Sequence, residues 1–300
     1  MAETWAAHAG GYGRGETPVA GPEAREAPWT LGEALAAARL DWPALPVSLG
    51  APGEGWRDVA ALFEDEDAIT AWLAFRARSY PGTDLKAAAA FVLADYAYLL
   101  TMVTAPLFVG FGLVPDLIPG NVHLRYAGLG GESGERGVES DANPGAELRF
   151  ASEAAFAEPA VPVVSPSLCD HYRRAVEAHV APLVETLSGR SRLARSAFWR
   201  LVADAVAFAF LDAGERVGRI DYATECALAV VKQAGSPLSN RQTGFVDLLP
   251  EGEAGAMACP RRFRVRGGCC RYYTVTGGSY CAPCVLKRPA DRDRDLRSLI

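Results

Sequence analysis

The sequence lacks the short motifs that bind nucleotides or build several common hydrolytic sites. It contains no Gly-rich dinucleotide fingerprint after a strand, no P-loop, no His-Glu-x-x-His pair and no nucleophile elbow. No site for a flavin or a nicotinamide is therefore expected. If the protein carries out redox chemistry, its electrons must come from another protein or from a small reductant.

The chain also lacks the features of a secreted protein. Residues 1–5 show neither a basic n-region nor an apolar h-region, so no secretory signal is predicted. The seven cysteines are odd in number and four of them are clustered, unlike a secreted disulfide framework. Thiolate ligands survive in a reducing compartment, and we expect a cytoplasmic location. Residues 1–28 are rich in Gly, Ala, Pro and Glu and are predicted to be a flexible tail.

The cysteine cluster lies near the C-terminus. Cys269-Cys270 is followed by ten residues and then by Cys281-Ala-Pro-Cys284, so four thiols fall within sixteen positions. Residues 271–276 are β-branched and aromatic and precede Gly277-Gly278, which predicts a hairpin with a two-residue glycine turn. In that register the Cys-x-x-Cys segment folds back toward the cysteine pair, and the four thiolates converge.

Four converging thiolates suit a tetrahedral zinc ion or an iron–sulfur cluster. Neighbouring side chains of an extended backbone point to opposite sides, so Cys269 and Cys270 reach one small ion only with local distortion. A two-iron cluster is wider and tolerates that divergence better. The common zinc pattern has two spaced Cys-x-x-Cys knuckles, whereas this chain has one, and the plant-type ferredoxin spacing is absent. The spacing favours a cluster, while zinc, a disulfide or unligated thiols stay open.

This cysteine pattern, a Cys-Cys pair followed after ten residues by Cys-x-x-Cys, resembles the C-terminal [2Fe–2S] signature of the FhuF-type ferric-siderophore reductases. The stretch from Pro182-Leu183 to Phe198-Trp199 resembles the helical body of that family more loosely, and no resemblance is found before about residue 55. Gly267-Gly268 departs from the less flexible, more basic approach expected in the family.

The resemblance implies a reductase that passes an electron to iron(III) held by a siderophore and releases iron(II) in the cytoplasm. The implied cluster ligands are Cys269, Cys270, Cys281 and Cys284, with an external electron donor and, as a further expectation, peripheral association with the inner face of the membrane. Two alternatives stay open. One is a ferredoxin-like carrier or redox sensor, and the other is a zinc-stapled, non-catalytic interaction module.

Acidic residues are absent from residues 254–290. This window contains seven Lys and Arg residues and therefore has a net charge of +7. The net charge of the whole chain is −6, so the remaining residues carry −13 (−6 minus 7). The overall charge gives no support to nucleic-acid binding. The basic window is either an ordinary solvated surface or a patch that steers an acidic donor or an anionic ferric chelate. The candidate docking residues are Arg262, Arg264, Arg266 and Arg271, and Tyr272 and Tyr273 are candidates to shield the sulfurs.

The remainder predicts a mostly α fold with a small antiparallel β component, in the α+β class. Residues 29–250 are expected to form a helical body with a β-ribbon around 121–150, and 251–300 a cluster-binding module that includes the hairpin. Thr30 and Glu33 form a capping-box pattern, and residues 57–77 are predicted to form one helix.

Residues 87–115 are nearly all apolar and long enough to span a bilayer. Asp95 near the middle and Pro106 favour a buried core helix instead. The remaining candidate ligands are weaker. His123, His171 and His179 are interpreted as structural, Cys169 and Cys226 as buried or incidental thiols, and Cys259 as a weak substitute ligand.

Overall fold

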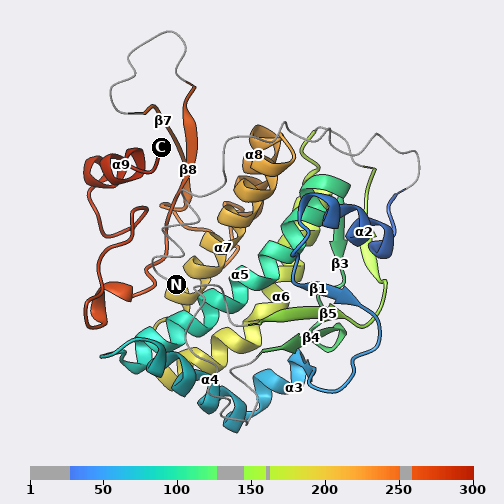
Figure 1. Cartoon of the computed structure of the whole chain (residues 1–300), viewed down its shortest axis with the longest axis horizontal. Helices are drawn as coiled ribbons and strands as arrows, with labels where there is room; N and C mark the ends of the chain where they lie inside the picture. Colours follow the sequence, from blue (N-terminus) through green and yellow to red (C-terminus); the bar gives the residue numbers. More distant parts are fainter. Residues whose placement is uncertain (1–27, 127–144, 160–162, 251–258) are drawn as a thin grey trace.

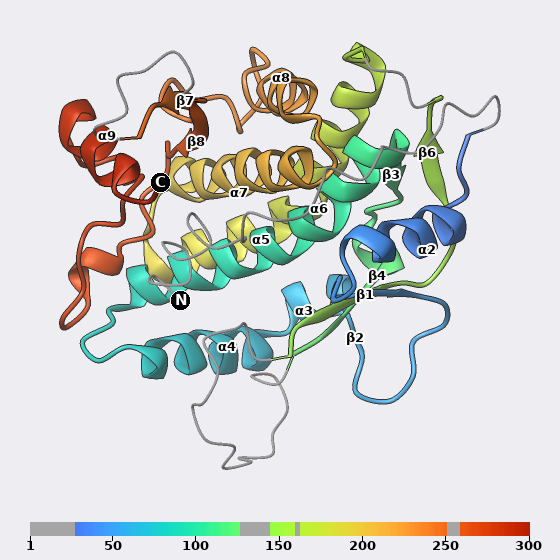
Figure 2. The same cartoon turned by 45° about the horizontal axis from the view of Figure 1, so that its top comes forward.

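The computed structural model describes residues 28–126, 145–159, 163–250 and 259–300. The predicted tail is outside these residues except for its last position. Within them the fold is mostly helical with small sheets, which confirms the α+β class. Three long helices, α5 (Leu85–Phe111), α6 (Pro166–Ser191) and α7 (Arg195–Arg216), run side by side through its centre (Figures 1 and 2). The shorter α8 (Ile220–Val231) packs against α7.

The apolar stretch is the central helix α5. The Asp84 carboxylate caps its start by accepting from Ala87 N at 2.7 Å, and Gly112 ends it in the left-handed conformation with φ 63°. α5 is long and apolar enough to cross a membrane, but 83% of its most apolar window is buried inside the protein. Its one acid, Asp95, is buried against Arg76 of α4 (Glu66–Ser79). The prediction of a buried core helix, typical of a soluble fold, is confirmed.

The N-terminal helices show one confirmed prediction and one correction. The capping box is present at the start of α2 (Leu31–Asp41), where Glu33 N donates to Thr30 Oγ1 at 3.2 Å and Thr30 N donates to Glu33 Oε2 at 3.1 Å. The single helix expected over 57–77 is wrong. Asp65 has an extended backbone and accepts from Ala68 N at 2.9 Å. It therefore caps α4 and separates it from α3 (Val59–Glu64), which follows the short strand β2 (Arg57–Asp58).

The predicted β-ribbon is present. β4 (Val122–Arg125) pairs antiparallel with β5 (Glu147–Phe150), and β1 (Val47–Leu49) and β2 extend them to a sheet ordered β1-β5-β4-β2. A second antiparallel pair is formed by β3 (Leu113–Pro115), which comes directly after α5 in the chain, and β6 (Ala155–Ala157). Both lie at the far end of the long helices from the C-terminal segment (Figures 1 and 2).

The hairpin predicted across the cysteines is wrong. Residues 272–274 form one turn of 3-10 helix, η3 (Tyr272–Thr274), and Gly278 N donates to Val275 O at 2.9 Å. The apolar side chains that suggested a strand pack on the helical body instead. Tyr272 contacts Tyr80 edge to face at 5.3 Å between ring centroids, and Val275 packs with Phe91 of α5.

An antiparallel pair lies just before the cysteines instead. β7 (Gly244–Leu248) pairs with β8 (Arg261–Val265), and α9 (Pro289–Arg297) follows the cysteine segment. This pair spans the boundary expected between residues 250 and 251. The C-terminal segment is thus tied to the body through a shared sheet as well as through side chains.

A buried histidine stabilises the packing of α5 against α6. Both ring nitrogens of His179 are hydrogen-bonded at 2.5 Å, Nε2 with Tyr96 Oη and Nδ1 with Leu117 O. The ring is fully buried, which lowers the pKa of His179 from 6.5 to about 4. As expected from the sequence, the environment is that of a structural histidine.

The stability of the fold should therefore fall in acid. The folded state holds His179 neutral, whereas the unfolded chain takes up a proton below its ordinary pKa of 6.5. The stabilisation is present above that pH and is lost as the pH falls toward 4, by roughly 3 kcal/mol in total from this residue. Urea unfolding between pH 8 and pH 4 measures it. In His179→Gln the decrease should be smaller by that amount, and an unchanged pH dependence would contradict the assignment.

Candidate metal centre

The structure brings the four predicted cysteine ligands together, although by a different backbone path. The Cys270 thiol donates to the Cys281 sulfur, and the Cys281 thiol donates to Cys284. Cys269 lies close enough for its charge to interact with those of Cys270 and Cys281. No three His, Cys, Asp or Glu side chains of the described residues are already spaced around a single metal ion. The four thiols are thus close to one another but are not arranged around one ion.

Each of the four sulfurs accepts a hydrogen bond from nitrogen. The donors are Arg271 N to Cys269 (3.4 Å), Tyr272 N to Cys270, Leu286 N to Cys284, and Arg266 Nη1 to Cys281 (3.7 Å). Donation to sulfur favours the thiolate over the thiol, and hydrogen bonds to ligand sulfurs are one way that proteins tune iron–sulfur clusters. Backbone N–H groups thus donate to three of the sulfurs, and the Arg266 side chain donates to the fourth.

The four thiols are not equivalent. Hydrogen bonding from Cys281 lowers the pKa of Cys284 to about 7. The hydrogen bond to Cys281, together with burial, raises the pKa of Cys270, and burial raises that of Cys269. Cys284 is therefore more easily converted than Cys269 or Cys270 to the thiolate that binds metal.

The glycine pair before the cysteines is explained by close contact with its surroundings. A Cβ on Gly267 would lie 2.2 Å from Asn240 Oδ1, and one on Gly268 would lie 2.8 Å from the carbonyl carbon of Arg200. The same approach lets Gly267 N and Gly268 N donate to the Asp204 carboxylate of α7 at 2.8 and 3.0 Å. The glycines therefore fix the start of the cysteine segment against α7.

Two of the four predicted docking residues are not on the surface. Arg264 and Arg266 are only 5% and 3% exposed. Arg264 Nη1 donates to the Asp204 backbone carbonyl at 2.9 Å, and Arg266 Nε donates to the Asp204 carboxylate at 3.1 Å. Neither can form part of an exposed docking face, because both side chains point into the protein toward α7.

The other two predicted docking residues are already engaged in ion pairs. Arg262 lies 2.7 Å from both Asp221 and Asp247, and Arg271 lies 3.0 Å from Asp84. Two further cations of the basic window, Lys287 and Arg288, pair with carboxylates of α9, namely Asp295 and Asp291. The strongly positive patch suggested by the sequence is thus largely neutralised by acids from outside residues 254–290.

The buried charges fit an anionic thiolate group. Beside the cysteines lie two buried guanidinium groups and one buried carboxylate, Asp204. Burial by itself lowers the pKa of Arg266, but the negative charges of Cys270, Asp204 and Cys281 outweigh it and raise the pKa. Burial and the neighbouring Arg266 lower the pKa of Arg264 to about 10, so it too is charged at neutral pH. Metal-bound thiolates would balance this excess of positive charge, and the residues present therefore fit a cysteine-ligated cluster or metal ion.

The sulfurs lie near an exposed aromatic rim. Tyr273 and Tyr280 are 38% and 49% exposed, with their ring centroids 5.0 Å apart, and Leu286 is 51% exposed. Cys269, Cys270 and Cys281 are only half-buried, whereas Cys284 is buried. Tyr272 belongs to the contact with the body, whereas Tyr273 faces solvent, so the two tyrosines that the sequence grouped together have different surroundings.

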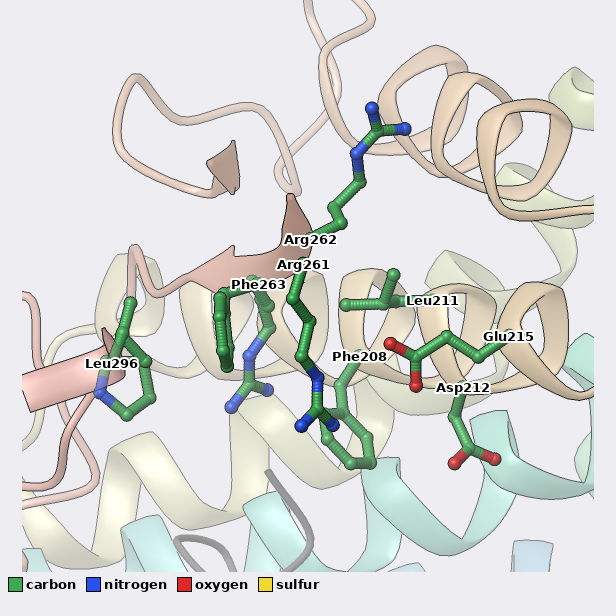
Figure 3. Close-up of a pocket in the computed structure, with 10 residues that line it drawn as sticks. Phe208, Leu211, Asp212, Glu215, Arg261, Arg262, Phe263 and Leu296 are labelled. Atoms are coloured by element: carbon green, nitrogen blue, oxygen red, sulfur yellow. The ribbon is translucent and has the colours of Figure 1, made fainter. Parts of the chain in front are cut away.

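The pocket drawn in Figure 3 lies between α7 and β8 and is also lined by Pro283 and by Leu296 of α9. Its lining includes Phe208, Glu215, Arg261 and Phe263, and its volume is about 40 Å³. Arg261 extends along the pocket toward Glu215, whereas Arg262 points away from it (Figure 3). This volume holds a few water molecules at most and is far too small for a metal chelate.

The weaker candidate ligands lie elsewhere. Cys169 and Cys226 are buried and hydrogen-bonded to each other, which confirms them as buried thiols, whereas Cys259 is exposed before β8. His171 stacks on Phe156 with centroids 4.3 Å apart, and His123 lies on β4, 3.9 Å from the Asp58 carboxylate. Sequence reasoning missed Asp204, because an aspartate in an apolar helix gives no signal of which distant groups it will bind.

Comparison with known proteins finds no matching family model and no matching curated protein. The resemblance to ferric-siderophore reductases therefore depends mainly on the cysteine spacing, and the functional argument depends on the residues described above.

Proposed function

We propose that the protein is a ferric-siderophore reductase whose Cys269, Cys270, Cys281 and Cys284 hold a [2Fe–2S] cluster. Such a cluster supplies reversible one-electron transfer. The observation that carries the proposal is the gathering of these four sulfurs, each with a nitrogen donor, beside buried positive charge. The reaction adds one electron to siderophore-bound iron(III), and the iron(II) formed leaves its hard oxygen ligands more readily. The proposed location is the cytoplasm or the inner face of the membrane.

The chain's own residues suggest how electrons enter and leave. No nucleotide motif is present, so an external protein or small reductant supplies the electron. The described pocket is too small for a chelate, and three of the four cysteines are half-buried. The ferric siderophore would therefore dock on the outside of the segment, next to the rim formed by Tyr273, Tyr280 and Leu286. Electron transfer across such a contact requires proximity but no bond between iron and protein.

Spectroscopy of anaerobically purified protein tests the cluster. A brown protein that gives an S = 1/2 EPR signal after reduction with dithionite is expected. Adding a ferric siderophore to the reduced protein should bleach that signal while one iron(II) per electron appears on a colorimetric chelator. A colourless protein with stoichiometric zinc, obtained under conditions that preserve clusters, would overturn the proposal in favour of the zinc-stapled module.

A ferredoxin-like carrier or redox sensor is the second candidate. The small pocket favours it, since a carrier needs no substrate site. The two functions differ in which molecule takes the electron from the reduced protein. A carrier would keep its reduced signal in the presence of ferric siderophores and lose it only to a redox partner protein.

A further inference from the structure

Arg266 is placed between the cysteine set and a buried acid. Its Nη1 donates to Cys281 Sγ at 3.7 Å, while its Nε donates to Asp204 Oδ2 at 3.1 Å. Both Arg266 and Asp204 are nearly fully buried, with side chains 3% and 2% exposed. Interactions between charges are much stronger in such surroundings than in water. One cation is thus held in direct contact with a ligand sulfur and away from solvent.

Asp204 is held in place by groups from two parts of the chain, Thr243 and residues 266–268. Besides Arg266, its carboxylate accepts from Thr243 Oγ1 at 2.9 Å and from the backbone N–H groups of Gly267 and Gly268. These donors leave the carboxylate little freedom to turn. The position of Arg266 beside Cys281 is therefore fixed in part by its contact with α7.

We propose that Arg266 is a positioning residue that stabilises the reduced state of the centre, and that Asp204 opposes this effect. The inference rests on the proposed cluster. Reduction adds one negative charge to the group held by the cysteines, and a fixed cation beside Cys281 stabilises that added charge. The nearby carboxylate destabilises it. The reduction potential is therefore set by a pair of opposite charges, one in contact with the sulfur and one behind it.

The midpoint potential of the purified, iron-loaded protein tests this directly, with dithionite and mediators and EPR detection. Arg266→Gln should shift the reduction equilibrium toward the oxidised form by about tenfold, which is about 59 mV for one electron. Asp204→Asn, which keeps the size of the side chain and removes its charge, should shift it in the opposite direction. Arg262→Gln is the matched control, since Arg262 lies on β8, four residues before Arg266, but pairs with Asp221 and Asp247, and no shift is expected.

Opposite shifts distinguish an electrostatic role from a structural one, because loss of packing would not reverse sign between the two variants. Arg266→Lys retains the charge and should lie between wild type and Arg266→Gln. Shifts of one sign, or none, would overturn the proposal. So would loss of iron loading in both Arg266 variants, which would make Arg266 a folding residue.

The outcome is separable from that of the proposed function. The titration needs no siderophore, so the potential shifts stand even if ferric siderophores prove inert as oxidants. If the iron-loaded protein has the same midpoint potential in Arg266→Gln, in Asp204→Asn and in the wild type, this inference alone is overturned. A wild-type protein that binds zinc instead overturns the proposed function and this inference together.

Discussion

Replacing Cys281 by serine is expected to abolish iron loading and ferric-siderophore reduction together. Cys281 is the central sulfur of the set, because it exchanges hydrogen bonds with both Cys270 and Cys284 and receives the Arg266 guanidinium. A serine hydroxyl is shorter and harder than a thiolate and cannot replace it in all three contacts. Even changes to groups outside the ligand shell lower metal affinity about 10–100-fold, so loss of a ligand should lower reduction by at least about 100-fold.

Iron per chain, visible absorption and trapped iron(II) measure this effect. Cys259→Ser is the matched control, because Cys259 is an exposed free thiol near the same segment and is the weak substitute ligand suggested by the sequence. It should load iron and reduce siderophores like the wild type. Full reduction by Cys281→Ser would rule out the assigned ligand set, and loss in the Cys259 variant would show that the set includes another thiol.

Gly268→Ala is the second change with a large expected effect. The added methyl group would lie 2.8–3.0 Å from backbone atoms of Arg200 and Leu201 in α7, and backbone cannot move aside as a flexible side chain does. The chain must shift outward, which weakens the Gly268 N–H bond to Asp204 and displaces Cys269. Overpacking of this kind costs about 1–3 kcal/mol. Iron loading should fall roughly 10–100-fold, which is the loss typical of changes to residues that hold metal ligands in place without binding the metal.

The comparison variant is Gly189→Ala, which lies in the last turn of α6. A Cβ there would meet no atom within 4 Å, and alanine favours a helix over glycine by about 1 kcal/mol. Thermal unfolding should show Gly189→Ala equal to or above wild type and Gly268→Ala below it, with iron content following the same order. Wild-type iron content in Gly268→Ala would mean that the cysteine segment is not fixed against α7.

The local signals of the sequence predicted local structure well. Thr30 with Glu33 forms the capping box, and the apolar stretch around Asp95 is a buried helix because Arg76 compensates the carboxylate. The four cysteines meet because their spacing is short, whatever backbone joins them. In contrast, the aromatic residues after Cys270 have the composition of a strand, but Tyr272 packs on Tyr80 instead of pairing across a hairpin.

The electrostatic prediction failed because charge was counted along the chain. Residues 254–290 carry no acid, yet Asp84 and Asp221 reach this window from α5 and α8, and Asp204 reaches it from α7. These partners are 40 to 190 positions away, and no sequence period indicates that they meet. A local excess of charge predicts a basic surface only if the tertiary fold leaves it without counterions.

Asp204 also makes residues 243–268 necessary for the stability of the helix that precedes them. In a chain without those residues, the α7 carboxylate has none of the four donors that Thr243, Arg266 and the two glycines supply. A buried charge left without its partner costs about 3–5 kcal/mol. We therefore expect the helical body and the thiol set to unfold in one transition.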